Sequence, residues 1–137
     1  MSKKIVITGG LGYIGTELCK IYSGVSWNNE ILVIDNRFVS ERVNQLRNWN
    51  IDFIHGDILD KDLVNKYCKD ADVVHHLAGI TDVPRVKSES SDNKDAKIKL
   101  VAEEGTQNVI DAISDKCKII FPSTHVVYEG VDKVKND

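Results

Sequence analysis

The first fifteen residues constrain the fold most strongly, because a short apolar segment runs directly into a glycine-rich turn. Residues 4–8 are apolar enough for a buried strand, and Gly9, Gly12 and Gly15 follow at once. A helical pattern comes next, with its apolar residues at Ile14, Leu18, Ile21 and Tyr22. This order predicts a βα unit in which the backbone and the N-terminus of the helix can approach bound phosphates.

The remaining chain alternates between strand-like and helix-like segments. Strands are predicted at residues 4–8, 31–35, 52–55, 72–77 and 118–122. Besides the first helix, helices are predicted near 40–49 and over 93–114, and a further one has Asp60 as its N-cap and apolar residues at Leu63, Val64, Tyr67 and Cys68. The alternation predicts an α/β fold of the Rossmann type. Its doubly wound parallel sheet carries helices on both faces and has five strands in the order 3-2-1-4-5.

The longest predicted helix, residues 93–114, has one apolar face and traces of a second. The first face is expected to pack on the sheet and consists of Ile98, Val101, Ala102, Gly105, Val109, Ala112 and Ile113. Leu100 lies off this face, and Thr106 and Ile110 extend the same side of the helix. An apolar patch that faces outward favours association, so a homodimer through this helix is expected.

Composition excludes several classes of function. The chain has 137 residues, 42% of them hydrophobic, and a net charge of -3, which argues against nucleic-acid binding. Its apolar runs are too short to cross a bilayer, so no membrane partner is expected. The three cysteines, Cys19, Cys68 and Cys117, are widely spaced and form no CxxC pair. They are interpreted as buried free thiols of a cytoplasmic protein.

The histidines are poorly placed for a metal site. His75 and His76 are adjacent in a predicted strand, so their side chains point to opposite faces of the sheet. His55 and His125 lie at other strand ends, with no carboxylate or cysteine at ligand spacing. No metal is therefore predicted.

Asp35 stands at the end of the second predicted strand, 20 residues after Gly15. A carboxylate at this place can accept hydrogen bonds from the hydroxyls of an adenosine ribose, and it repels a 2′-phosphate. The expected cofactor is therefore NAD rather than NADP. Arg37 keeps NADP open, because an arginine just beyond this strand can bind a phosphate. The alternative interpretation of Asp35 is a turn or capping residue.

Five motifs in order resemble the extended short-chain dehydrogenases/reductases, also called the NAD-dependent epimerase/dehydratase family. Thr8 to Gly15 is similar to the TGGxGYIG cofactor motif, and Asp57-Ile58 to a pair beside the adenine ring. Residues 76–79 resemble the HxAG motif, 104–109 the GTxNV stretch, and 123–128 the SSxxVYG segment. The resemblance covers essentially the whole chain.

The resemblance implies a set of site residues. The expected contacts with the cofactor come from Gly9, Gly12, Tyr13, Ile14, Gly15, Asp35, Asn36, Asp57, Ile58, Leu77, Ala78, Gly79 and Ser123. Thr124 is the expected catalytic hydroxyl, which would bond the reacting oxygen of the substrate. The family also uses a Tyr-x-x-x-Lys pair, and no such pair occurs in these 137 residues. Residues 1–137 are therefore interpreted as the N-terminal, NAD-binding portion of a longer enzyme, inactive by themselves.

The resemblance implies an enzyme that moves a hydride between a sugar carbon of a nucleotide sugar and NAD. The alternative is a dinucleotide-binding sensor or interaction module without catalysis. A Tyr-x-x-x-Lys pair in sequence downstream of residue 137 would favour the enzyme. A Rossmann protein without a dinucleotide, such as a methyltransferase, is a third possibility, against which Gly12, Gly15 and the Ser123-Thr124 segment argue.

Overall fold

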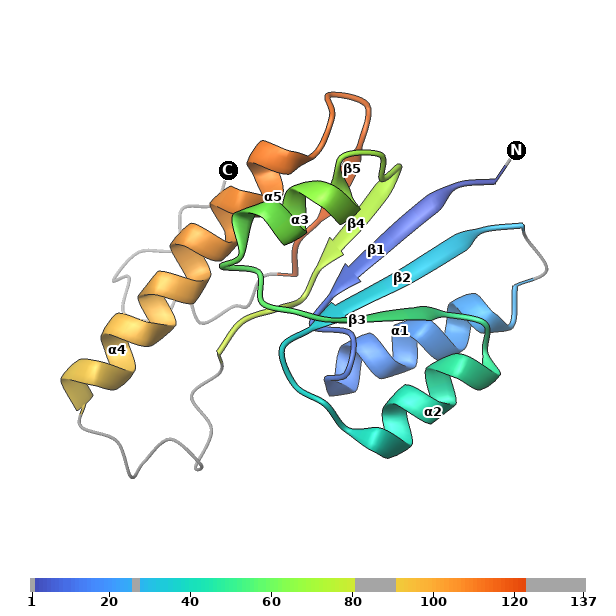
Figure 1. Ribbon diagram of the computed structural model, residues 1–137, viewed down its shortest axis with the longest axis horizontal. Helices are drawn as coiled ribbons and strands as arrows, with labels where there is room; N and C mark the ends of the chain where they lie inside the picture. Colours follow the sequence, from blue (N-terminus) through green and yellow to red (C-terminus); the bar gives the residue numbers. More distant parts are fainter. Residues whose placement is uncertain (1, 26–27, 81–90, 123–137) are drawn as a thin grey trace, which may run out of the picture.

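The computed structural model describes residues 2–25, 28–80 and 91–122, and within them one parallel sheet forms the centre of the molecule (Figure 1). Its five strands are β1 (Lys4–Thr8), β2 (Glu30–Asp35), β3 (Asp52–His55), β4 (Val73–His76) and β5 (Lys118–Ile120). The spatial order is β3-β2-β1-β4-β5, and every neighbouring pair is parallel. The predicted order 3-2-1-4-5 is confirmed. β4 is one residue shorter at each end than predicted, and β5 stops at Ile120 rather than at residue 122.

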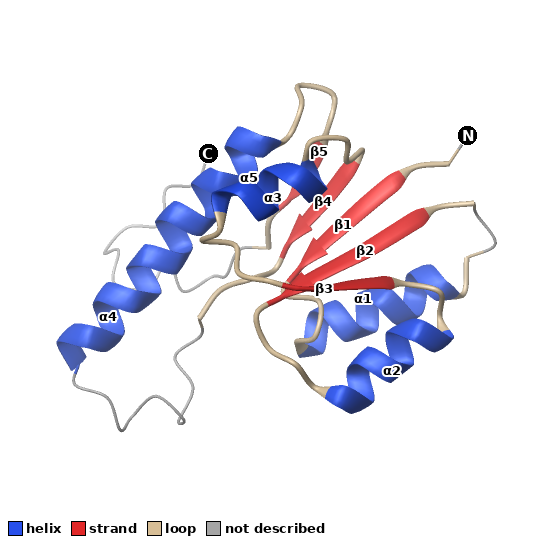
Figure 2. Cartoon of the chain, in the orientation of Figure 1, coloured by secondary structure: helices blue, strands red, loops and turns tan. Residues whose placement is uncertain are grey.

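Helices cover both faces of this sheet (Figure 2). They are α1 (Tyr13–Ser23), α2 (Ser40–Asn48), α3 (Lys61–Cys68), α4 (Ser91–Leu100) and α5 (Thr106–Ala112), with a π-helical segment η2 (Val101–Gly105) between the last two. α1 and α2 lie on one face, and α3 and α5 lie together on the other. Asp60 caps α3 as predicted, since its carboxylate accepts a hydrogen bond from the backbone N–H of Leu63.

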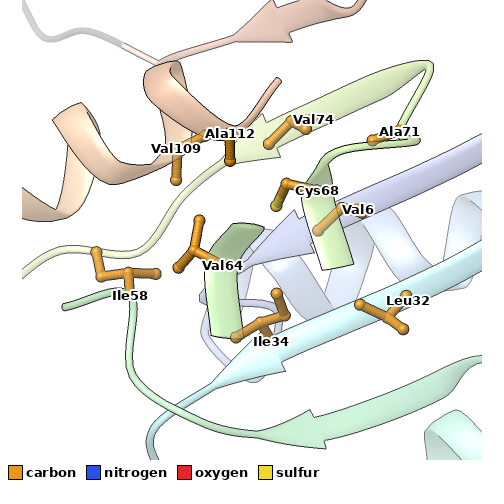
Figure 3. Packing of buried hydrophobic residues seen from close by; sticks show 10 residues of the cluster. All are labelled: Val6, Leu32, Ile34, Ile58, Val64, Cys68, Ala71, Val74, Val109 and Ala112. Carbon is orange, nitrogen blue, oxygen red and sulfur yellow. The ribbon is translucent and has the colours of Figure 1, made fainter. Parts of the chain in front are cut away.

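Alternating residues of the central strands supply the two halves of the core. Val6 of β1 packs with Leu32 and Ile34 of β2 under α3 and α5, as Figure 3 shows. Ile5 and Ile7 point the other way, into a cluster with α1 and α2. Because both faces are covered there, residues 5–7 of β1 and 31–34 of β2 are apolar in succession rather than alternately polar. The successive apolar residues that predicted a doubly wound sheet are thus explained by burial on both faces of the central strands.

The predicted inner face of the first helix is wrong at two positions. Ile14 and Ile21 are 66% and 65% exposed, whereas Gly15 and Cys19 are buried. The helix turns its small residues toward the sheet, because the glycine turn brings its first turn very close to the loop below. Leu18 and Tyr22 pack against the core as expected.

The long helix predicted over 93–114 spans residues 91–112 and contains a π turn. After this turn, Gly105, Val109 and Ala112 are buried as predicted. Ala102 is exposed, which corrects its place in the apolar face. In a π turn each residue advances the chain by a smaller angle than in an α-helix, so Ala102 falls outside the buried stripe.

Two of the three thiols are buried, and the third is partly exposed. Burial raises the pKa of Cys19 to about 12 and that of Cys68 to about 11, so both thiols stay protonated. Cys117 is only partly buried, which corrects its assignment to the interior. Among the residues described here, no helix combines the length and apolarity needed to span a membrane.

The adjacent histidines of β4 point to opposite faces, as predicted. The ring of His75 bonds the hydroxyl of Tyr22 from α1, with 2.7 Å between Nε2 and Oη. The ring of His76 meets Thr106 of α5 on the other face. Burial lowers the pKa of both imidazoles below the usual value, so both rings are neutral near pH 7.

These lowered pKa values predict a loss of stability in mild acid. The unfolded chain takes up protons on His75 and His76 as the pH falls through about 6.5, while the folded chain resists until lower pH. The urea midpoint should therefore be lower at about pH 5.5 than at about pH 7.5. His75→Gln, which removes one of the two titrations, should reduce this difference. Equal midpoints at both pH values would contradict the prediction.

Candidate functional site

The carboxyl ends of β1, β2 and β4 meet where the chain leaves the sheet in opposite directions. From β1 it enters α1 on one face, and from β4 it leads toward the long helix on the other (Figure 1). In open parallel sheets such a switch point opens a crevice in which ligands bind. The loop residues predicted from the sequence, 9–15, 35–36 and 77–79, all border this point.

The glycine turn is built by contacts that no larger residue would allow. Gly9 has a φ of 69°, and a Cβ there would lie 2.8 Å from the backbone of Ala78. A Cβ on Gly15 would lie 2.5 Å from the Cα of Gly10. Gly10 was not predicted, although its own Cβ would lie 2.5 Å from a methyl group of Val33. These glycines hold the start of α1 against the ends of β1, β2 and β4.

The N-terminus of α1 is free of internal capping. Gly12 is its N-cap and supplies no side chain, and the first turn contains no acidic residue. A Cβ at Gly12 would lie 3.3 Å from the carbonyl oxygen of Gly9 and 3.7 Å from Nη2 of Arg37. Tyr13 and Ile14 are exposed beside it. Uncapped N–H groups and the partial positive charge of the helix are favourable for an anion at this place.

Asp35 is buried, and its carboxylate is already hydrogen-bonded. Oδ2 accepts from the backbone N–H of Leu11 at 3.0 Å, and Oδ1 accepts from the backbone N–H of Arg37 at 2.9 Å. The side-chain Nε of Arg37 lies 3.4 Å from Oδ1. Asp35 therefore stabilises the turn, in agreement with its interpretation as a turn residue. Each carboxylate oxygen can accept more than one bond, so capacity for a ribose hydroxyl remains.

Two guanidinium groups border the same turn. Arg37 lies over Gly12, and Arg42 of α2 donates from Nη1 to the carbonyl oxygen of Leu11. The guanidinium carbon of Arg42 also lies 5.5 Å from the ring centroid of Tyr13, within the range of a cation–π contact. Arg42 was not predicted, because its contact with the turn spans 31 positions of the sequence. Both charges add to the positive potential at the start of α1.

Asn36 and the loop after β3 lie next to Asp35. The backbone carbonyl of Asn36 accepts a hydrogen bond from His55 Nε2 at 3.0 Å. Asp57 bonds its own loop, because Oδ1 accepts from the backbone N–H of Leu59 at 2.9 Å. The amide of Asn108 donates to the carbonyl of Ile58 at 2.9 Å, so α5 holds this loop in place.

The side chain of Ile58 belongs to the core rather than to the surface of the site. It is only 5% exposed and packs in the cluster under α3 and α5. A Cβ on Gly105 would come within 2.4 Å of its terminal methyl group. Ile58 can therefore meet a ligand mainly through its backbone.

The loop after β4 lies directly beside the glycine turn at the same edge of the sheet. Leu77 packs with the cluster under α1 and α2, whereas Ala78 packs with the cluster under α3 and α5. Apart from the two chain neighbours of Gly79, no atom of the described residues would lie within 4 Å of a Cβ at this position. None of these residues therefore crowds Gly79. Thr8 at the end of β1 bonds the backbone N–H groups of both Leu77 and Ala78.

Ser123 and Thr124 lie outside the described residues, as does His125. Within the ranges 2–25, 28–80 and 91–122, no three acidic, histidine or cysteine side chains gather closely enough to hold a metal ion. The predicted residues that the structure does describe come together from four loops. The fold and this crevice define the chain as a Rossmann-type α/β protein.

The chain belongs to the 3-beta hydroxysteroid dehydrogenase/isomerase family, whose model matches residues 6–136. Relatives agree with the predicted membership in the extended short-chain dehydrogenases/reductases. UDP-N-acetyl-alpha-D-glucosaminuronate decarboxylase of Bacillus cytotoxicus is 32% identical over 93% of this chain and 38% of its own length. CDP-paratose 2-epimerase of Salmonella typhi is 31% identical over 96% of this chain and 40% of its own. The chain thus spans about two fifths of these curated relatives.

Solved structures show the same arrangement. The crystal structure of UDP-glucose 4-epimerase from Brucella ovis, in complex with NAD, matches with a TM-score of 0.64 and 26% identity. The match covers 87% of this chain and 35% of the epimerase. The Rossmann-type fold predicted from the sequence is therefore confirmed by a known protein as well as by the strand order.

The crowding at Gly15 predicts a sharp difference between two glycines of the same helix. Gly15→Ala should lower the free energy of unfolding by about 1–3 kcal/mol, because the new methyl group meets backbone atoms that cannot give way. Gly24→Ala is the matched control. Its methyl group would meet only ordinary contacts at 3.6 and 3.9 Å, and its φ of -84° suits alanine, so stability should stay constant or rise by less than about 1 kcal/mol. Urea denaturation measures both, and equal losses would contradict the prediction.

Proposed function

We propose that residues 1–137 form the NAD-binding Rossmann domain of a longer oxidoreductase. The observation that carries the proposal is the uncapped N-terminus of α1 beside the buried carboxylate of Asp35. A dinucleotide needs both features, since one receives its pyrophosphate and the other its ribose hydroxyls. The complex of the Brucella ovis relative with NAD supports the choice of cofactor.

The proposed contacts follow the loops of the crevice. The pyrophosphate would lie over Gly12, Tyr13 and Ile14, where Gly9 and Gly15 keep the backbone clear of side chains. Asp35 and Asn36 would bind the adenosine ribose, and the backbone of Asp57 and Ile58 would border the adenine ring. Leu77, Ala78 and Gly79 would line the nicotinamide side with Ser123.

The proposed activity of the longer protein is oxidation and reduction of a nucleotide sugar. Bound NAD would supply the hydride chemistry, and the chain would supply orientation and charge. The names of the relatives, a decarboxylase and epimerases of nucleotide sugars, support this substrate class. Thr124 is the proposed catalytic hydroxyl. Because residues 1–137 contain no Tyr-x-x-x-Lys pair, these residues alone should not turn over a nucleotide sugar.

A binding module without catalysis remains the second candidate. It is favoured by the same missing pair, which is the acid/base group of the family. Binding of NAD is common to both candidates, so the experiment below tests what they share. A tyrosine and lysine at the family spacing in downstream sequence would decide for the enzyme.

A homodimer through the long helix, an isomerase-type reaction and a cytoplasmic location belong to the same proposal. Leu100 and Ile110 are 42% and 49% exposed, which supports an outward apolar patch on this helix. Thr106 is not part of it, because its side chain is partly buried and its hydroxyl is hydrogen-bonded to His76 within the protein. The patch is therefore narrower than the sequence predicted.

Calorimetric titration tests the cofactor. The unmutated chain should bind NAD more tightly than NADP, because the buried carboxylate of Asp35 disfavours a 2′-phosphate. Asp35→Ala should weaken NAD binding by about 1–3 kcal/mol and narrow the preference for NAD over NADP. The loop bonds to Leu11 and Arg37 are lost as well, so Asp35→Asn, which keeps an acceptor oxygen, should weaken binding less.

Asp52→Ala is the matched control, since it removes an exposed carboxylate at the opposite end of the neighbouring strand β3. Its affinity for NAD should equal that of the unmutated chain. Tighter binding of NADP than of NAD by the unmutated chain would contradict the proposal. It would indicate instead that the guanidinium of Arg37 binds the 2′-phosphate of NADP.

A further inference from the structure

Five polar groups converge at the buried junction between β1 and β4. The hydroxyl of Thr8 lies 2.8 Å from Nδ1 of His76, and Nε2 of the same ring lies 2.9 Å from the hydroxyl of Thr106. The backbone N–H groups of Leu77 and Ala78 each point at Thr8 Oγ1 from 3.1 Å. The N–H of Leu77 is shared with the Thr8 carbonyl oxygen, also at 3.1 Å. Thr8 is fully buried and His76 is 1% exposed.

Counting protons in this network fixes the state of the ring. A hydroxyl oxygen has two lone pairs and one proton, and both lone pairs of Thr8 Oγ1 face backbone N–H groups. Its proton must therefore go to Nδ1 of His76, which has to be the unprotonated nitrogen. A neutral ring then carries its hydrogen on Nε2 and donates it to Thr106.

The surroundings of His76 keep this state. Thr8 faces the ring from β1, Thr106 faces it from α5, and the ring of Phe121 stacks on it with centroids 5.8 Å apart. None of these three carries a charge or titrates near neutral pH. The neighbouring titratable ring, His75, lies on the other face of the sheet with Tyr22. A proton on Nδ1 would aim a third N–H group at Thr8 Oγ1, which has no lone pair left for it.

We infer that His76, locked as its neutral Nε2–H tautomer, is a positioning residue of the dinucleotide site. It orients the Thr8 hydroxyl, which in turn holds the backbone of Leu77 and Ala78. That backbone borders the proposed dinucleotide site directly beside the glycine turn, where Gly9 approaches Ala78. The inference rests on the proposed NAD site and adds a residue that touches no part of the ligand.

Nitrogen-15 spectroscopy of the histidine rings tests the tautomer without any ligand. His76 should show an unprotonated Nδ1 and a protonated Nε2, and it should keep this pattern as the pH falls past the usual histidine range near about 6.5. Thr106→Val, which removes the acceptor of the Nε2 hydrogen, should leave Nδ1 unprotonated but shift the Nε2 resonance. A hydrogen on Nδ1 of His76 at neutral pH would overturn the inference.

Two substitutions of His76 separate positioning from general packing. His76→Phe keeps a ring against Phe121 but removes the acceptor for Thr8, so the dissociation constant for NAD should rise about tenfold. His76→Asn places an amide oxygen near the position of Nδ1, so it should restore most of the affinity. Both constants are measured by calorimetry on protein whose folded fraction is checked by circular dichroism.

His75→Phe is the matched control, because it removes another buried histidine ring, at the adjacent position on the opposite face of the sheet. It should lower the urea midpoint and leave the affinity for NAD unchanged. Equal affinities of the folded unmutated protein and His76→Phe would show a purely structural role and overturn the inference alone. Failure of the unmutated protein to bind NAD would overturn the proposed function and this role together. If His76→Phe does not fold, the ring spectra of the unmutated protein and of Thr106→Val still test the tautomer.

Discussion

The close approach of the glycine turn to the loop after β4 is the constraint on which the rest of the site depends. A Cβ at Gly9 would lie 2.8 Å from Ala78, so the two loops touch through backbone atoms alone. β1 and β4 are paired up to Thr8 and His76, and just beyond this pair Thr8 bonds the backbone of Leu77 and Ala78. The contact fixes the glycine turn, and with it the start of α1, against the loop after β4. Binding of the proposed dinucleotide would then require little ordering of the protein, which favours affinity.

The fold could be predicted from local patterns because both faces of the sheet are buried. The apolar runs 5–7 of β1 and 31–34 of β2 could be predicted without knowing which helices pack on which face, since all of these residues are buried. Predictions failed where a contact across the fold overrides periodicity. Ile14 lies outward because Gly15 must face the turn, and Ala102 lies outward because a π turn changes the phase of the helix. Neither effect is encoded in the spacing of apolar residues.

Some residues of the candidate site could likewise be predicted from local sequence, and others could not. Residues that act through backbone conformation or a strand end, such as Gly9, Gly12 and Asp35, are visible in the sequence because their position in the βα unit defines their role. The contact of Arg42 and the bonds of His76 could not be predicted from the sequence. The partner of Arg42 lies 31 positions away along the chain, and those of His76 lie 68 and 30 positions away. The sequence placed His76 in a motif but could not indicate which ring nitrogen carries the hydrogen. That follows only from the number of donors around Thr8.

Preorganisation would also give Asp35 the proposed selectivity for NAD over NADP. Its carboxylate is held by the N–H groups of Leu11 and Arg37 before any ligand arrives, so it cannot turn away from an incoming ribose. A hydroxyl can donate to a fixed carboxylate, whereas a phosphate has no proton to offer at neutral pH and adds like charge in a buried place. The ion pair with Arg37 offsets this repulsion only weakly, because the guanidinium is half exposed and solvated. Discrimination between NAD and NADP would therefore arise from the rigidity of the turn as much as from the charge of one side chain.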